Sequence, residues 1–277
     1  MSSSRQMKNI LNYVKVYAGI GISVVVLLAI LVLITVNGLA NLSFDFVFSL
    51  DAPRGFSLMP MIVNTLIIVV LTVLIAGPLG IGAAIYLNEY ASTKSRFVKF
   101  VRVSIETLSG IPSIIYGLFG FLFYVIVLQW TWSLQAGIFT VAIMILPIII
   151  RSTEEALKSV PMSYRMGSYA LGAGKFYTIR RVVLPAAMNG IIASIILSIG
   201  RLIGETAALL LTAGTLLDMP TNLRSSGATL SVFMYLITVE HGDMARAYAT
   251  AIVLMSLVLG LNLLANVVAR KLGKVSK

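Results

Sequence analysis

Long apolar runs, separated by short polar segments, recur along this chain of 277 residues and restrict the folds open to it. Hydrophobic residues make up 58% of the sequence and charged residues only 11%, whereas soluble domains contain about 25% charged residues. Because a run of about 18 or more apolar residues is typical of a helix that crosses a membrane, each long run predicts one span. We predict an all-α membrane protein with six transmembrane helices, over residues 17–39, 61–87, 105–128, 136–150, 185–215 and 247–269.

The distribution of lysine and arginine between alternate loops predicts the orientation in the membrane. Most of the 21 lysine and arginine residues lie in the terminal segments and in the loops 94–102 and 151–181. The intervening loops carry only Arg54, Arg224 and Arg246. Cytoplasmic loops are enriched in these residues, so both termini and both basic loops are predicted to be cytoplasmic. The net charge of +11 is therefore interpreted as a topology signal, which disfavours its alternative, nucleic-acid binding.

Residues that could support catalysis or bind a metal are few. The chain has no cysteine, which excludes disulfides, thiolate nucleophiles and metal sites built on cysteine. The one histidine, His241, is predicted to lie on the surface of an outer loop, and Glu154 and Glu155 are interpreted as a solvated or interfacial face. The stretch 171–176 resembles a P-loop only superficially, because no Ser or Thr for magnesium follows Lys175. We predict no catalytic residue, no metal and no bound cofactor.

The cytoplasmic loop 151–184 is too long for a simple connection and predicts a short helix outside the membrane. Pro161 ends the preceding helix, Ser163 is a candidate N-cap, and Gly172 fits the left-handed residue that stops a helix. Such a helix has no core of its own. It is expected to pack either on a soluble partner or on lipid headgroups.

Two ionisable residues, Arg201 and Glu205, lie within the predicted fifth span. An ionisable group inside a membrane helix costs about 2.5–3.5 kcal/mol by insertion scales, so it is expected to face protein or water. The i, i+4 spacing places both residues on one face of a helix, with Arg201 about 24 Å along from Pro185 and so toward the outer half of the membrane. The guanidinium offers a fork of donors that matches an oxyanion. The alternative is a structural ion pair that neutralises itself.

The end of the cytoplasmic loop carries a resemblance to a known family. The spacing from Gly172 to Val182, Leu184 and Pro185 matches the Gly-x9-Ile-x-Leu-Pro half of the loop signature of ABC importer permeases. That signature usually begins with Glu-Ala-Ala six residues before the glycine, where this chain has Met-Gly-Ser at 166–168.

Other stretches narrow the resemblance within the ABC importer permeases. Residues 84–91, 110–120 and 200–207 together resemble the phosphate-specific (Pst) importer permeases. The continuation 208–214 is similar to the A-type subunit of these importers, with Ala208 at a position that is often Pro.

The resemblance implies an ABC importer type I permease fold. Its core would be 61–270, preceded by an N-terminal cytoplasmic segment, first helix and outer loop at 1–60, and followed by a cytoplasmic tail at 271–277. It also implies one half of a heterodimeric channel for inorganic phosphate in a prokaryotic cell membrane, powered by a separate ATPase dimer that hydrolyses the ATP. An extracytoplasmic phosphate-binding protein would dock on the outer loop 216–245.

The resemblance further implies roles for individual residues. Coupling to the ATPase is implied for Ser163, Tyr164, Ala170, Leu171, Gly172 and Pro185, and lining of the substrate pathway for Arg201, Glu205 and Thr206. Three alternatives stay open: the C-type partner permease, a permease for another oxyanion such as sulfate or molybdate, and a secondary carrier driven by an ion gradient. The short cytoplasmic helix that ends at Gly172 discriminates against the carrier, which has no need of it.

Overall fold

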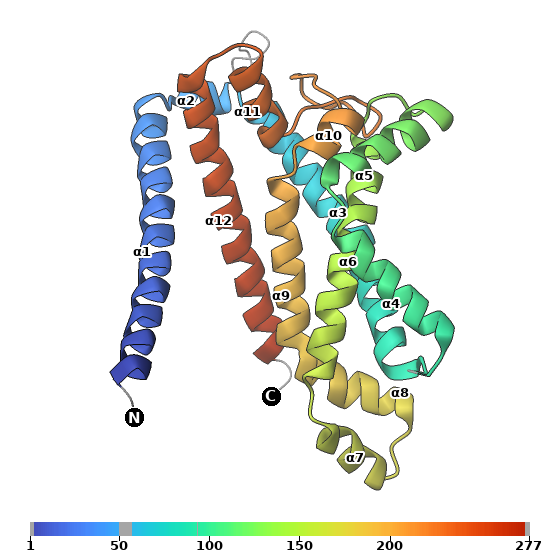
Figure 1. The fold of residues 1–277 in the computed structure, drawn as a ribbon. Coiled ribbons are helices and arrows are strands. Elements are labelled where there is room, and N and C mark those ends of the chain that lie inside the picture. The colour runs from blue at the N-terminus through green and yellow to red at the C-terminus, as the bar shows by residue number, and fades with distance from the viewer. Residues whose placement is uncertain (1–2, 50–56, 93, 275–277) are drawn as a thin grey trace.

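The computed structural model describes residues 3–49, 57–92 and 94–274, and side chains between residues 12 and 267 of those ranges (Figure 1). The described residues form helices joined by turns and loops, which confirms the all-α prediction. The elements are α1 (Ser3–Ala40), α2 (Phe44–Phe48), α3 (Met59–Ile85), the π-helical η1 (Tyr86–Tyr90), α4 (Arg96–Ser109), α5 (Ser113–Gly120), the π-helical η2 (Phe121–Val127), α6 (Leu134–Lys158), α7 (Met162–Ala170), α8 (Lys175–Thr178), the π-helical η3 (Ile179–Val183), α9 (Leu184–Ile203), α10 (Ala207–Thr212), α11 (Leu230–Val239) and α12 (Met244–Lys274).

Five helical stretches are long and apolar enough to cross a membrane. They are Asn12–Ala40, Met59–Tyr90, Leu134–Lys158, Lys175–Ile203 and Met244–Val267. Each overlaps one predicted span, and several extend further because polar residues continue the same helix beyond the apolar run. A sixth crossing is available only if a bent pair of helices is counted as one span.

That bent pair corrects the predicted third span, 105–128, which is not one continuous helix. The helix α4 ends at Ser109, and α5 begins at Ser113 at an angle of 101° to it. Pro112 lies between them with φ −57° and ψ 138°. Because proline lacks a backbone N–H and clashes with a preceding helical turn, it can begin a helix but cannot continue α4.

The predicted fifth span, 185–215, is also interrupted. The helix α9 ends at Ile203, a turn follows, and the short helix α10 begins at Ala207. Beyond α10, Gly214 adopts φ +93°, a left-handed conformation that favours glycine. The chain therefore folds back inside the half of the bundle opposite α7 and does not run straight across it.

The core of the bundle lies around α3 and α6. Fully buried side chains such as Ile68 on α3 and Ile145 on α6 form its centre, together with residues of α9 to α12. Small residues let the helices approach: a Cβ at Gly190 of α9 would lie 2.6 Å from the Cβ of Ala156 on α6. Ser194, one turn further, is buried and lies 3.4 Å from the Thr153 hydroxyl. The small-residue face of α9 is therefore used for packing within the subunit.

Figure 1 shows how the elements divide between the two ends of the bundle. The start of α1, the end of α12, and α7 with α8 lie at one end, whereas α2, α10 and α11 lie at the other. This arrangement agrees with the predicted topology, in which both termini and the loop 151–184 share one side of the membrane. The predicted division into 1–60, 61–270 and 271–277 stays a prediction.

Candidate functional site

The helix α7 is the short helix predicted between the fourth and fifth spans. It begins at Met162, directly after Pro161, and no side chain caps it. The predicted N-cap role of Ser163 is wrong, because the helix starts one residue earlier and Ser163 lies within its first turn. The predicted stop is confirmed: Gly172 has φ +80°, its N–H donates to Tyr169 O, and Ala173 N–H donates to Ser168 O. This pair of bonds is the Schellman motif.

A buried arginine fastens α7 to the rest of the bundle. Arg165 is 9% exposed, and its guanidinium donates to the carbonyls of Val160 and Leu157 at 2.8 and 3.1 Å. It also forms an ion pair with Glu89 on η1, at 2.8 Å. Because three hydrogen bonds, one of them to a carboxylate, converge on this guanidinium, the buried charge is stabilised by several bonds at once. The sequence reading used Arg165 only as a topology charge and missed this anchor.

The opposite face of α7 and its following turn expose apolar side chains. Leu171 is 90% exposed, and Tyr164 and Tyr177 are exposed beside it. Together with Ser163, Gly172 and neighbouring residues they line an open hollow of about 710 Å³, which we call the α7 groove. An apolar surface at a bundle end, outside the spanning segments, is typical of a protein-binding site.

The residues predicted to couple to the ATPase divide into two groups in the structure. Ser163, Tyr164, Leu171 and Gly172 meet at the α7 groove, and Ala170 is exposed close by at the end of α7. Pro185 does not line it: it lies in the first turn of α9, where its fixed φ and missing N–H suit a helix start.

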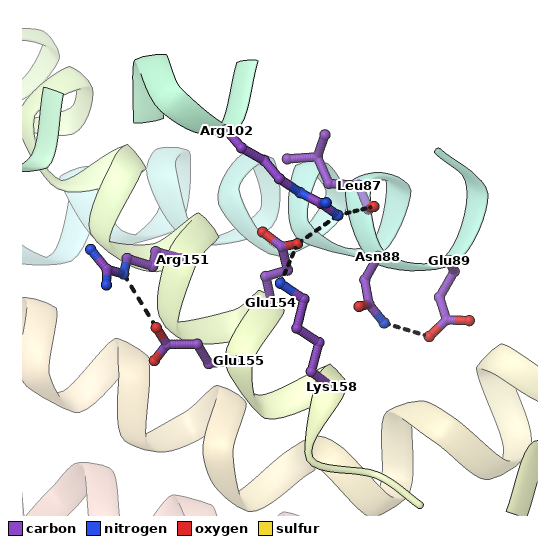
Figure 2. Close-up of polar contacts among 8 residues, drawn as sticks. All are labelled: Leu87, Asn88, Glu89, Arg102, Arg151, Glu154, Glu155 and Lys158. Atoms are coloured by element: carbon purple, nitrogen blue, oxygen red, sulfur yellow. Dashed lines mark hydrogen bonds and ion pairs between the residues drawn. The ribbon is translucent and has the colours of Figure 1, made fainter. Parts of the chain in front are cut away.

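A second charged cluster ties three helices together beside α7 (Figure 2). Glu154 of α6 is only 7% exposed and lies between Arg102 of α4, at 2.9 Å, and Lys158, at 2.8 Å. Arg102 also donates to Leu87 O on η1 at 3.0 Å. Glu155 points away and pairs with Arg151 at the surface. The expected solvated face is therefore correct for Glu155 and wrong for Glu154, which faces the protein interior.

Glu205 occupies a different position from the one its spacing predicted. Because α9 ends at Ile203, Glu205 does not share a helical face with Arg201, and that expectation is wrong. Glu205 is 8% exposed, and its carboxylate accepts from Ala208 N–H at 3.3 Å, at the start of α10. Its carbonyl accepts from the Ser231 hydroxyl at 2.6 Å. Glu205 therefore bonds to the first turn of α10 through its side chain and to the first turn of α11 through its carbonyl.

Arg201 is left exposed in the last turn of α9. No ion pair within the described part of the chain includes Arg201. Its charge lies within electrostatic range of the Tyr116 phenol on α5, which donates to Leu108 O at 2.8 Å. Thr206, the third residue predicted for the substrate pathway, is half-buried at the start of α10. Arg201 is thus left without an ionic partner, because the nearby carboxylate of Glu205 accepts a backbone hydrogen bond instead.

No group of three or more metal-ligating side chains occurs among the residues that the structure describes. The arrangement offers two kinds of contact. At the α7 end it offers an apolar surface on a helix held by a buried ion pair, and at the end of α9 it offers an unneutralised guanidinium. The first can bind a protein and the second can bind an anion.

Comparisons with known proteins give the chain its family. Residues 76–274 match the family of binding-protein-dependent transport system inner membrane components. The probable ABC transporter permease protein YqgI of Bacillus subtilis is 36% identical over 200 residues, which cover 70% of this chain and 68% of that protein. The phosphate transport system permease protein PstA of Mycobacterium leprae is 36% identical over 203 residues, covering 72% of this chain and 66% of that protein.

A comparison of folds agrees with the sequence matches. A solved chain of a bacterial alginate ABC transporter, in complex with a periplasmic protein that holds an alginate pentasaccharide, superposes with a TM-score of 0.72. The alignment covers 98% of both chains at 19% identity, so it shows the permease fold alone. This chain is a multi-pass membrane protein, and it belongs to the family of binding-protein-dependent transport system inner membrane components.

Proposed function

We propose that this chain is a permease subunit of an ATP-driven ABC importer that moves inorganic phosphate into the cell. The chain would form half of the translocation pathway, in a heterodimer with a second permease, and a separate ATPase dimer would hydrolyse the ATP. An extracytoplasmic phosphate-binding protein would deliver the anion. The named phosphate permeases among its relatives support the choice of substrate.

The observation that carries the proposal is the α7 groove. A short helix that exposes Leu171 and Tyr164 to water has no stability advantage in isolation, because exposed apolar area gains nothing from folding. On its buried face, the same helix is bonded to α6, the following turn and η1 through Arg165. This combination suits a surface that receives force from a soluble protein, and the basic loops 94–102 and 151–181 favour the cytoplasmic side for it.

The unneutralised charge of Arg201 supports an anionic cargo. A guanidinium stays protonated at any physiological pH and presents parallel N–H donors, a geometry suited to the oxygens of phosphate. Glu205 does not occupy those donors, since it caps α10. We propose Arg201 as the anion contact, Glu205 as the residue that shapes the turn, and Thr206 as a neighbouring hydroxyl on the pathway.

The decisive experiment is reconstitution of the complex in proteoliposomes. The chain is combined with a second permease, the ATPase and the binding protein, and uptake of radiolabelled phosphate is measured with and without ATP. We expect uptake that requires ATP and survives ionophores that collapse ion gradients. Uptake that needs a gradient and ignores ATP would establish a secondary carrier. If excess sulfate or molybdate abolished the uptake of radiolabelled phosphate while excess unlabelled phosphate did not, the chain would be a permease for another oxyanion.

A further inference from the structure

The five-residue π-helical segment η1, at the end of α3, makes contacts with three other elements. A π-helix is rare, and short π-helical segments are frequent at functional sites because they change the register of a helix locally. Here η1 continues α3 from Tyr86 to Tyr90, at the same end of the bundle as α7. Its side chains and one carbonyl are the groups that α4, α7 and α8 contact.

The contact from α7 is the strongest of these. Arg165 Nη2 donates to Glu89 Oε1 at 2.8 Å, and both side chains are almost fully buried. Asn88 also donates to the same carboxylate oxygen at 2.8 Å, which orients Glu89 toward α7. Because the guanidinium is bonded at the same time to the end of α6 through Leu157 O, it fixes α7 against two helices in one geometry.

Two weaker contacts surround this pair. The ammonium of Lys175, at the start of α8, lies 4.9 Å from the centre of the Tyr90 ring, within the range of a cation–π interaction. From the other side, Arg102 of α4 bonds to both Leu87 O and Glu154. Figure 2 shows Leu87 and Arg102 beside the Asn88–Glu89 pair. The segment η1 is therefore joined to α4, and through Arg102 to α6, on one side and to α7 and α8 on the other.

The covalent path from α7 leads elsewhere. Through α8 and η3 the chain continues directly into α9, so a displacement of α7 reaches α9 along a continuous helix from Lys175 to Ile203. No such backbone path joins α7 to α3. Among the hydrogen bonds and ion pairs of the described residues, the link from α7 to α3 and η1 is the Arg165–Glu89 pair.

We infer that η1 is the relay that carries a displacement of α7 to α3 and α4, and that Glu89 and Arg165 are its positioning residues. The inference rests on the proposed function, because it takes the ATPase as the source of the displacement. When the ATPase displaces α7 at the α7 groove, the groups bonded to Arg165 on the buried face of α7 are displaced with it. With the pair intact, a displacement of α7 reaches α3 through η1 as well as through the apolar packing of the core; with the pair broken, only the packing remains and α3 follows α9 less closely.

The test is Glu89→Ala in the reconstituted complex. This change removes the tie to η1 but leaves Arg165 bonded to Val160 and Leu157, so α7 keeps its position on α6 and its groove. We expect ATP hydrolysis stimulated by the binding protein to stay within about twofold of wild type. Phosphate import should fall at least tenfold, so the ATP consumed per phosphate rises by the same factor. The matched control is Glu155→Ala, which breaks the exposed pair with Arg151 and should leave that ratio unchanged.

A second readout does not depend on the transported substrate. The native chain has no cysteine, so Ser92→Cys, an exposed position just after η1, accepts a single spin label. The electron paramagnetic resonance spectrum of the label should change when a non-hydrolysable ATP analogue binds the wild-type complex. It should change less in the Glu89→Ala background. Absence of phosphate import by wild type would overturn the proposed function, while the label would still test the relay.

Each remaining outcome is decisive for the relay. A Glu89→Ala complex that imports phosphate at the wild-type ATP ratio, or whose label responds as in wild type, overturns it. Loss of stimulated hydrolysis together with import would make Glu89 a docking requirement and would also overturn it. If Glu89→Ala does not assemble, the same measurements are made on Glu89→Gln, which retains an acceptor oxygen for Arg165 but not the charge. Failure of both variants to assemble would assign the pair to folding and exclude the relay.

Discussion

The two charged regions of the molecule use their arginines in opposite ways. At the α7 end, Arg165 and Arg102 are each bonded to a buried carboxylate and to backbone carbonyls. At the end of α9, Arg201 is exposed and unpaired, and the nearby carboxylate of Glu205 bonds to the backbone of α10. The comparison separates arginines that hold the fold from an arginine whose charge is available to a ligand.

This difference has an energetic basis. A buried carboxylate that loses its arginine partner is strongly destabilising, whereas Arg165 without Glu89 keeps two carbonyl acceptors. The arginines of the first kind are therefore required for assembly. An exposed guanidinium has no partner that its removal would leave unpaired, so its removal should leave the fold intact. Substitutions in the two regions should therefore fail in different assays.

Arg165→Ala should have the largest effect on stability. It strands the buried Glu89 carboxylate and frees two carbonyls, at a cost of about 3–5 kcal/mol. We expect loss of assembly, or a large fall in the midpoint of thermal unfolding in detergent. Arg151→Ala, which breaks an exposed pair, is the control and should shift that midpoint little. A stable Arg165→Ala complex would remove the distinction between the two regions.

Gly172→Val should have an intermediate effect. A β-branched residue at φ +80° costs about 1–2 kcal/mol in backbone strain, while a Cβ there meets no other atom within 4 Å. We expect the end of α7 to be displaced, so that ATP hydrolysis is uncoupled from import while insertion in the membrane persists. Gly21→Val, on α1 and equally unobstructed but far from the α7 groove, controls for side-chain volume. Normal transport by Gly172→Val would show that the geometry of the α7 end is irrelevant to coupling.

Glu205→Ala should cost less, about 1 kcal/mol, because it removes one long hydrogen bond at the start of α10. Glu205→Gln keeps an acceptor oxygen and should be close to neutral for stability and for uptake. Thermal unfolding and phosphate uptake of both variants check this. A Gln variant that is as damaging as the Ala variant would mean that the charge of Glu205, and not its role as an acceptor, matters.

Leu171→Ser should have the smallest effect on stability, within about 0.5 kcal/mol, because the side chain is 90% exposed. Its effect should appear in binding: co-purification of the ATPase should weaken at least tenfold. Leu216→Ser, an exposed residue in the predicted outer loop, is the matched control and should leave co-purification unchanged. Equal behaviour of the two variants would exclude the α7 groove as the ATPase contact.

The transmembrane helices and the end of α7 could largely be predicted from the sequence, but the buried ion pairs could not. Spans and the Gly172 stop follow from local pattern, since apolar length and a left-handed glycine act within one element. The end of α9 at Ile203 could not be predicted, because apolar residues continue through α10 and a glycine within a helical pattern is tolerated. The burial of Glu154 and Arg165 depends on which face α4 and η1 cover, and this is decided by tertiary packing. The i, i+4 spacing of Arg201 and Glu205 misled because α9 ends at Ile203, between the two residues.

In the proposed importer, Arg201 contacts the transported anion and does not form an internal ion pair. The most direct test of this contact is Arg201→Gln, alone and combined with Glu205→Gln, with assembly and phosphate uptake measured on the same preparations. We expect Arg201→Gln to assemble normally and to lose uptake at least a hundredfold. Arg201→Lys should restore little, because it lacks the fork of donors, and the double variant should be no better than Arg201→Gln. A single variant that fails to assemble, with assembly and uptake rescued in the double variant, would contradict the contact.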